Sequence, residues 1–198
     1  MADARIRAAL RLAGLVGAGA EAVEAEADLA REQLTSALPV PRAQWYRGKH
    51  AEFIMPPFLA PSPSRFSDGR YGVLYSAFSL ETAATEHGYH LQFFLQSARA
   101  PRGFFRRQHI TLQAKRPVPD LRRDDPALFD PNDYRIAQER GSCLRADGAP
   151  ALVYPSVRDR GGTCVAFFIP SSIGQVRLLD TIAYAWDGGQ LAVFQAMR

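Results

Sequence analysis

Two neighbouring segments place a tyrosine and a carboxylate where they could act on a bound ligand. Tyr75 lies in the apolar run 72–77, and Glu86 follows in a helix-forming stretch among alanines and aromatic residues. A half-buried glutamate beside an aromatic pocket can stabilise a positive charge that develops during a reaction. A carboxylate on a helix more often faces solvent, so the pattern fits a purely structural role as well. His90 is four residues after Glu86 and therefore shares its helical face.

A serine and an arginine stand at two further places where a ligand could bind. Ser156 follows an apolar run, 151–154, and a glycine pair stands at 161 and 162. Ligands tend to meet strand ends, although a loop serine that caps a turn has the same pattern. Arg47 stands between Tyr46 and a glycine that would let a ligand approach the backbone. It could clamp a phosphate or be a surface charge.

The segment 65–72 reads RFSDGRYG and leads directly into the apolar run that contains Tyr75. It fits a solvated turn, and it also fits a binding loop in which Arg65 would contact a ligand. No Walker loop, dinucleotide-binding glycine pattern, zinc-protease histidine spacing or nucleophile elbow occurs in the sequence. The sequence therefore predicts no metal site and none of the common nucleotide-binding loops.

The order of predicted elements favours an α+β fold, because helices and strands do not alternate regularly. We expect helix over 2–35, a short strand and turn at 45–48, and an irregular proline-rich loop over 56–63. Ser79 is a plausible N-cap for a long helix that follows the strand 72–77. Asp130 and Pro131 should open a second helix, which Gly141 should close. The remaining strands are expected at 104–112, 151–154, 163–169, 176–185 and 191–195.

The composition sets limits on the kind of protein. The chain has 198 residues, of which 47% are hydrophobic, so it can bury a core without a disulfide framework. The two cysteines, Cys143 and Cys164, are expected to be free, buried thiols. We find no secretory signal and no stretch of roughly 20 apolar residues, and we expect a cytoplasmic protein with no membrane contact. We expect a helical extension over 1–40 and a single domain over 41–198.

Taken together, these segments resemble the RES-domain family, the toxins of bacterial toxin–antitoxin pairs. The family is named for an arginine, a glutamate and a serine that recur in this order, and they match Arg47, Glu86 and Ser156. The family's stretch before the glutamate is similar to residues 65–77, which puts Tyr75 on the family's tyrosine. The resemblance covers about residues 44–170, and a histidine soon after the glutamate suits one branch of the family.

The resemblance implies a fold and a substrate. The family is similar to a compact ADP-ribosyltransferase toxin, with a split β-sheet core, flanking helices and a cleft for NAD+ as substrate. Its members degrade NAD+, with water or phosphate as acceptor, or transfer ADP-ribose to a protein, of which a phosphoribosyl pyrophosphate synthetase is one kind. An antitoxin with a helix-turn-helix domain neutralises them by covering the active site.

The resemblance also implies roles for individual residues. Glu86 would stabilise the cationic ribose, Tyr75 would stack near the nicotinamide, and Ser156 would orient Glu86 or bind the ribose. Arg47 would bind the phosphates, with Tyr46, Arg65 and His90 as further NAD+-binding candidates.

Two other function classes stay open. A non-catalytic module could bind nucleic acid through the arginines between 99 and 123, and it would be indifferent to Glu86. An RNase-type toxin could use His109 beside Arg106 and Arg107, although no second histidine with a matching role is identifiable.

Overall fold

The computed structural model describes residues 39–195 of the chain, so the helix expected over 2–35 lies outside the described residues. The described helices are η1 (Arg42–Gln44), α3 (Ala51–Ile54), α4 (Pro56–Leu59), α5 (Leu80–Ser97), η2 (Pro126–Phe129), α6 (Arg135–Ala146) and η3 (Pro170–Ser172). The described strands are β1 (Pro63–Ser64), β2 (Ser67–Asp68), β3 (Leu74–Ala77), β4 (Gly103–Ala114), β5 (Ala151–Pro155), β6 (Thr163–Phe167), β7 (Ile173–Trp186) and β8 (Leu191–Gln195).

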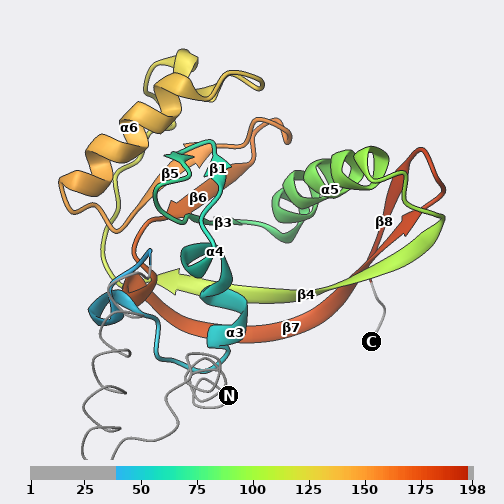
Figure 1. Ribbon diagram of the computed structural model, residues 1–198, viewed down its shortest axis with the longest axis horizontal. Helices are drawn as coiled ribbons and strands as arrows, with labels where there is room; N and C mark the ends of the chain where they lie inside the picture. Colours follow the sequence, from blue (N-terminus) through green and yellow to red (C-terminus); the bar gives the residue numbers. More distant parts are fainter. Residues whose placement is uncertain (1–38, 196–198) are drawn as a thin grey trace, which may run out of the picture.

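Two antiparallel three-stranded sheets form the framework, one in the order β3-β6-β5 and the other in the order β4-β7-β8. A third, two-stranded sheet joins β1 to β2. In Figure 1 the long β4–β7 pair curves through the lower half of the described fold, with α5 above its right-hand end and the β3-β6-β5 sheet and α6 above its left-hand end. The expected α+β class is confirmed, because both helices and sheets build the fold without a regular alternation.

The helix α5 faces the β3-β6-β5 sheet, which we call the short sheet, and packs on the β4-β7-β8 sheet, which we call the long sheet. Ser79 caps it as predicted, and its hydroxyl accepts a hydrogen bond of 3.1 Å from the Thr82 backbone N–H. Leu91 and Leu95 are buried against the side chains of β7, which include Tyr184. This packing ties α5 to the long sheet.

The buried strands β5 and β6 form the centre of the short sheet. All but one residue of each strand is buried, so the alternation typical of a sheet with one solvated face is lost. One cluster of core side chains lies on each side of this sheet, centred on Phe58 and Phe167 on one face and on Phe66 and Phe168 on the other. The sheet is therefore fixed from both sides, which gives a rigid support for residues at its edges and ends.

Several predictions about local structure were wrong. Residues 45–48 form no strand, and the proline-rich stretch 56–63 contains the helix α4, because Pro56 and Pro57 occupy its first turn, where no backbone donor is needed. The second long helix begins at Arg135 and not at Asp130. Gly141 lies inside this helix, where an added Cβ would collide with the Phe66 carbonyl oxygen.

The two cysteines are free as predicted, but only one of them is buried. Cys164 lies in the interior of the short sheet, whereas Cys143 is exposed on α6. The helical position of Cys143 explains the difference, because the buried face of α6 is supplied by Ala137, Gly141 and Leu144.

Candidate active site

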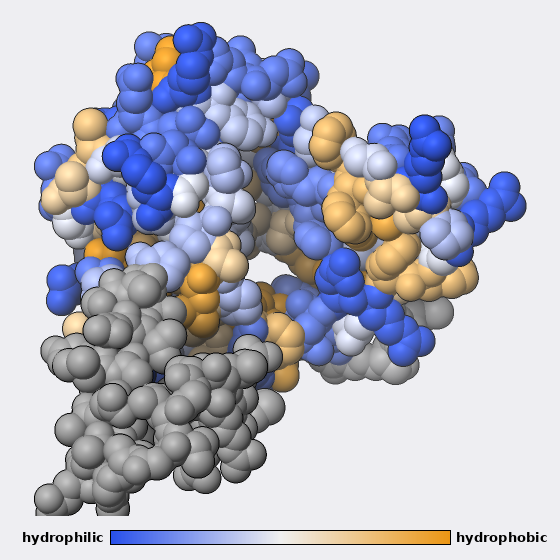
Figure 2. All heavy atoms as spheres, in the orientation of Figure 1, coloured by the Kyte–Doolittle hydropathy of each residue, from blue (hydrophilic) through white to orange (hydrophobic). Residues whose placement is uncertain are grey.

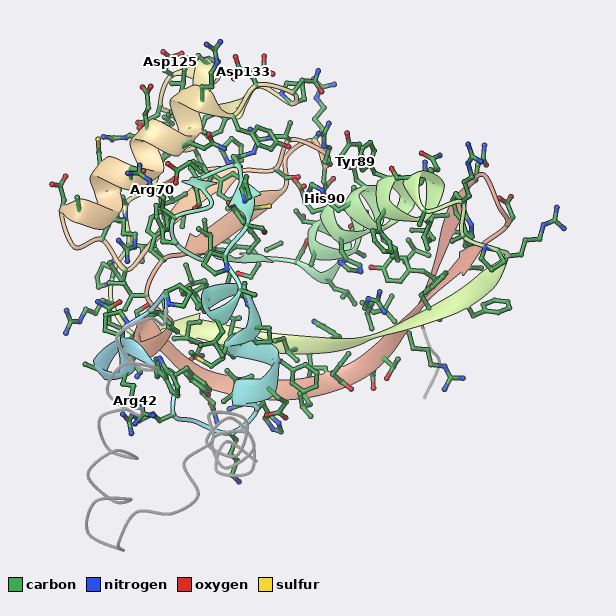
Figure 3. All side chains as sticks on the ribbon, in the orientation of Figure 1. Arg42, Arg70, Tyr89, His90, Asp125 and Asp133 are labelled. Atoms are coloured by element: carbon green, nitrogen blue, oxygen red, sulfur yellow. The ribbon has the colours of Figure 1, made fainter. Side chains whose placement is uncertain are left out.

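A cavity of about 400 Å³ lies between α5 and the short sheet. Figure 2 shows the surface hollowed between the part of the molecule built on α5 and the part built on the short sheet. Tyr89 and His90 project from α5 on the side that faces this sheet (Figure 3). The polar and aromatic residues that line the cavity come from both sides: Ser64, Arg65, Tyr75, Ser76, Glu86, His87, His90, Tyr134, Tyr154, Arg158 and Cys164.

The carboxylate of Glu86 is held by the loop that follows β5. The Ser156 hydroxyl donates a 2.6 Å hydrogen bond to Glu86 Oε1, and the Val157 backbone N–H donates another of 3.2 Å to the same oxygen. Among residues 39–195, none donates a hydrogen bond to Glu86 Oε2. One oxygen is thus fixed in place, while the other can accept from a ligand in the cavity.

Ser156 is itself fixed by the backbone of its own loop. Its hydroxyl accepts hydrogen bonds from the N–H groups of Arg158, at 3.2 Å, and Asp159, at 2.9 Å. With two donors aimed at the oxygen, the hydroxyl proton is directed to Glu86. Sequence reasoning offered a turn-capping serine and a ligand-contacting serine as alternatives, and the geometry shows that one hydroxyl both caps the turn and binds Glu86.

Tyr75 contributes a ring to the cavity and an anchored hydroxyl. Its side chain is 36% exposed, yet its hydroxyl accepts a 3.0 Å hydrogen bond from the Phe66 N–H and donates one of 2.9 Å to Ser64 Oγ. Burial of this hydroxyl raises the pKa of Tyr75 to about 12. The phenol therefore stays neutral near pH 7, and its ring is held in one place beside Tyr154, at a centroid distance of 6.4 Å.

Arg65 reaches the cavity from the loop between β1 and β2. Only 8% of this residue is exposed, and its Nη1 donates to the carbonyl oxygens of Asp130, at 2.8 Å, and Leu128, at 3.4 Å. Its guanidinium carbon also lies 4.5 Å from the centre of the Tyr134 ring. A cation with mainly neutral partners is thus held at the cavity wall.

Two histidines on α5 line the same cavity. Burial lowers the pKa of His90, and the positive charges of Arg158 and Arg65 add to this effect, while the Glu86 carboxylate opposes it. Burial also lowers the pKa of His87, together with the charge of Arg107, whose Nε lies 3.3 Å from His87 Nε2. Both imidazoles are consequently biased towards the neutral form.

The structure does not place Arg47 and Tyr46 at this cavity. Arg47 is exposed, donates to the Arg42 carbonyl oxygen at 3.4 Å, and lines a separate hollow together with Lys115. Tyr46 packs in the core and donates to the Lys49 carbonyl oxygen at 3.2 Å. The five other predicted site residues, from four separate segments, converge: Glu86, Tyr75, Ser156, Arg65 and His90.

Three residues that the sequence reasoning did not single out belong to the same arrangement. Arg158 lines the cavity, and its guanidinium carbon lies 3.7 Å from the centre of the Tyr89 ring. Thr82 is buried and donates a 2.6 Å hydrogen bond to Asp159, in the loop that carries Ser156. The only signal for Thr82 was its position four residues before Glu86, on the same face of one helix.

A second cavity continues from the first towards the long sheet. It has a volume of about 670 Å³ and shares Tyr75, Ser76, Ala77, Ala83 and His87 with the first. Its outer wall is formed by β4 and β7, including Arg107, Ile110 and Tyr184. The shared residues make the two cavities adjoin, so an extended molecule with several chemical groups could occupy both.

The fold and this cavity define an α+β protein with a pocket that combines a fixed carboxylate, arginines and aromatic rings. The family model for the RES domain matches residues 39–187, and the chain therefore belongs to the RES-domain family. This family is associated with toxins of toxin–antitoxin systems that act on NAD+. No curated protein matches the chain.

Two further observations concern metals and membranes. Within residues 39–195, no group of three or more histidine, cysteine, aspartate or glutamate side chains is arranged to hold a metal ion. Of the helices described, none has the length and apolar character needed to cross a membrane.

Proposed function

We propose that this protein is the toxin of a toxin–antitoxin pair, which cleaves the bond between nicotinamide and ribose in NAD+ and transfers the ADP-ribose to an acceptor. The observation that carries the proposal is the Glu86 carboxylate, which is held through one oxygen by Ser156 and Val157 and has its other oxygen available in the cavity. Membership of the RES-domain family, with its association with NAD+, supports the choice of substrate.

The chemistry requires charge stabilisation more than acid catalysis. Nicotinamide is cationic in NAD+ and leaves as a neutral molecule, so its departure needs no strong general acid. The ribose then acquires oxocarbenium character, as a sugar does in glycoside hydrolysis. A carboxylate fixed in advance stabilises that positive charge without having to reorganise during the reaction. Glu86 is suited to this role, since Oε2 can accept from a ribose hydroxyl.

The surrounding residues support the same assignment. The Tyr75 ring offers a flat face for the nicotinamide, and its hydroxyl is already engaged with Phe66 and Ser64, so the ring needs little ordering on binding. Ser156 acts through Glu86 as a positioning residue. Arg65 and His90 line the cavity and remain candidates for contacts with NAD+. The role of Arg47 in phosphate binding stays a prediction, and the residue lies at a separate hollow.

Partners follow from the same proposal. We expect a cognate antitoxin with a helix-turn-helix domain to cover the cavity. The acceptor would be phosphate, water or a protein side chain, and a phosphoribosyl pyrophosphate synthetase is one candidate target. The alternative of a nucleic-acid-binding module rests on the arginines between 99 and 123, and one of these, Arg122, is paired with Asp120.

Purified protein incubated with NAD+, with and without phosphate, tests the proposal through nicotinamide release. Release in buffer alone would identify a hydrolase, and release only with phosphate would identify a phosphorylase. If NAD+ stays intact in both, transfer of labelled ADP-ribose to proteins of a cell extract is the next measurement. The absence of all three reactions would refute the proposal.

The Glu86→Gln variant tests the role of the carboxylate, because the amide keeps the size of the side chain and removes its charge. We expect the rate of nicotinamide release to fall at least about a hundredfold, which is the usual effect of removing a group that stabilises charge in the transition state, and growth inhibition to be lost with it. Full toxicity of this variant, with an unchanged circular dichroism spectrum, would show that Glu86 has been assigned wrongly.

A further inference from the structure

Two arginines in the cavity, Arg65 and Arg158, have partners of a different kind from those of the ion-paired arginines on the surface. Arg70, Arg122 and Arg135 each form an ion pair of 2.7 Å or less with an aspartate two residues away. Among the described residues, no carboxylate lies within ion-pair distance of Arg65 or Arg158. A cation taken out of water without a counter-charge is unfavourable, so this pair calls for an explanation.

Both guanidinium groups are held by neutral groups of one segment. Arg65 donates to the carbonyl oxygens of Leu128 and Asp130, and Arg158 donates to the carbonyl oxygen of Pro131 at 3.0 Å. Each also packs on an aromatic ring, Arg65 on Tyr134 and Arg158 on Tyr89. Carbonyl oxygens and ring faces orient a guanidinium but leave its positive charge uncompensated.

Each guanidinium also keeps donors for a ligand. Arg65 uses Nη1 for its carbonyl partners and Arg158 uses Nη2, and no described residue accepts from the remaining nitrogens of either side chain. Both residues line the cavity that contains Glu86. The lowered pKa of His90, to which both arginines contribute and which Glu86 opposes, shows that the three charges act on one region.

We propose that Arg65 and Arg158 form an anion-binding subsite in the cavity, and that this subsite takes the diphosphate of a dinucleotide. The inference rests on the proposed function, and it names the residues that recognise the charged part of the substrate. Guanidinium groups with free, parallel donors suit phosphate oxygens, because two hydrogen bonds form to one group with defined geometry. The diphosphate would supply the missing counter-charge, while Glu86 faces the ribose.

Binding of ADP-ribose, measured by calorimetry, tests the subsite without requiring any reaction. We expect Arg158→Gln to weaken ADP-ribose binding about ten- to hundredfold, the usual effect of losing hydrogen bonds to a charged group. Adenosine, which has no phosphate, should bind the variant and the wild type equally. Arg177→Gln is the matched control, because it removes the same charge from an exposed arginine that lines none of the cavities described. It should leave ADP-ribose binding unchanged.

The second variant replaces Arg65, which is buried, and it therefore keeps the positive charge in order to preserve the fold. Arg65→Lys keeps the charge but loses the paired donors, and we expect it to weaken ADP-ribose binding at least about fivefold, with the circular dichroism spectrum of the wild type. If Arg158→Gln and Arg177→Gln bind ADP-ribose alike, or if the wild type does not bind it at millimolar concentration, the subsite is refuted.

Free phosphate is the other source of the same anion chemistry, and kinetics separate the two. If the subsite holds the dinucleotide, Arg158→Gln raises the KM for NAD+ whether or not phosphate is present. An increase confined to the KM for phosphate would overturn the assignment to the diphosphate. Failure of the proposed reaction is distinguishable, because a protein that binds ADP-ribose through Arg158 but releases no nicotinamide retains the subsite and lacks the activity.

Discussion

Thr82 and Asp159 join the first turn of α5 to the loop that carries Ser156. The Thr82 hydroxyl lies 2.6 Å from Asp159 Oδ2, and the Asp159 N–H in turn donates to Ser156 Oγ at 2.9 Å. Because Thr82 and Glu86 are one turn apart on the same helix, the loop is tied to α5 at both points. There is also no room for a side chain at Gly162, where a Cβ would lie 2.7 Å from Thr82 Oγ1.

Replacing Thr82 tests whether this hydrogen bond positions the reactive groups. Thr82→Val keeps the shape and removes the donor, so we expect a loss of about 1 to 3 kcal/mol in the free energy of unfolding, because the Asp159 carboxylate loses its partner. We also expect kcat to fall about tenfold with little change in KM, and Thr82→Ser to restore both. A stability loss with unchanged kcat would show that the contact is only structural.

Ser156→Ala should reduce catalysis more than binding. Glu86 Oε1 would keep the hydrogen bond from the Val157 N–H and the weak one of 4.0 Å from Cys164 Sγ, so the carboxylate would lose its shortest contact while the rest of the cavity stays intact. We expect kcat for nicotinamide release to fall about ten- to hundredfold, with KM for NAD+ within about twofold of the wild type. Ser97→Ala, which removes an exposed hydroxyl that bonds only to the Phe93 carbonyl oxygen, should change neither parameter.

Tyr75→Phe separates the ring from the hydroxyl. Loss of the hydroxyl leaves the Phe66 N–H without its acceptor, and we expect unfolding to become easier by about 1 to 3 kcal/mol. The ring remains, so the KM for NAD+ should rise less than it does in Tyr75→Ala. Equal KM values in the two variants would argue against stacking on the nicotinamide. Because burial raises the pKa of Tyr75 to about 12, Tyr75→Phe should leave the absorbance titration of the tyrosines unchanged up to about pH 10.

Acidification should destabilise the protein through two histidines before the carboxylates titrate. The pKa values of His87 and His90 are lowered in the folded protein. In the unfolded chain both histidines have the ordinary pKa of about 6.5, so below this pH the unfolded chain binds more protons than the folded protein. Their contribution is therefore present above pH 6.5 and is lost as the pH falls through the lowered values. We expect the melting temperature to decrease from pH 6.5 to 5, with a shallower decrease in the double variant His87→Gln, His90→Gln. An identical slope would contradict this assignment.

Gly141→Ala should destabilise the protein although alanine is the better helix former. Alanine normally stabilises a helix interior by about 1 kcal/mol relative to glycine. At this position the added Cβ would collide with the Phe66 carbonyl oxygen, so α6 would have to move away from the backbone at Phe66. We expect a net loss of at least about 1 kcal/mol in urea unfolding. Glu139→Ala, at an exposed position of the same helix, is the control, and a Gly141→Ala protein as stable as this control would contradict the packing argument.

The sequence by itself determined the elements whose local signals agree with their surroundings. The capping serine and the apolar spacing predicted α5, and β-branched and aromatic runs predicted β4 to β8 within a few residues. The order of the motifs indicated the RES-domain family, which the family model confirms over residues 39–187. Local signals failed where packing decides. The sequence predicted that Gly141 ends a helix, but this glycine allows α6 to pack closely on the backbone of Phe66.

Only the tertiary structure decided which candidate residues share a site. Spacing along the chain cannot show that Ser156 bonds to Glu86, since they are 70 residues apart and meet only because β5 pairs with β6 beside α5. For the same reason, the sequence motif grouped Arg47 with the cavity, whereas the fold places it at another hollow. Arg158 lies in the segment that carries Ser156, but the sequence assigned it no role, because an arginine becomes an anion-binding candidate only when its partners are known. Those partners, Pro131 and Tyr89, come from distant segments.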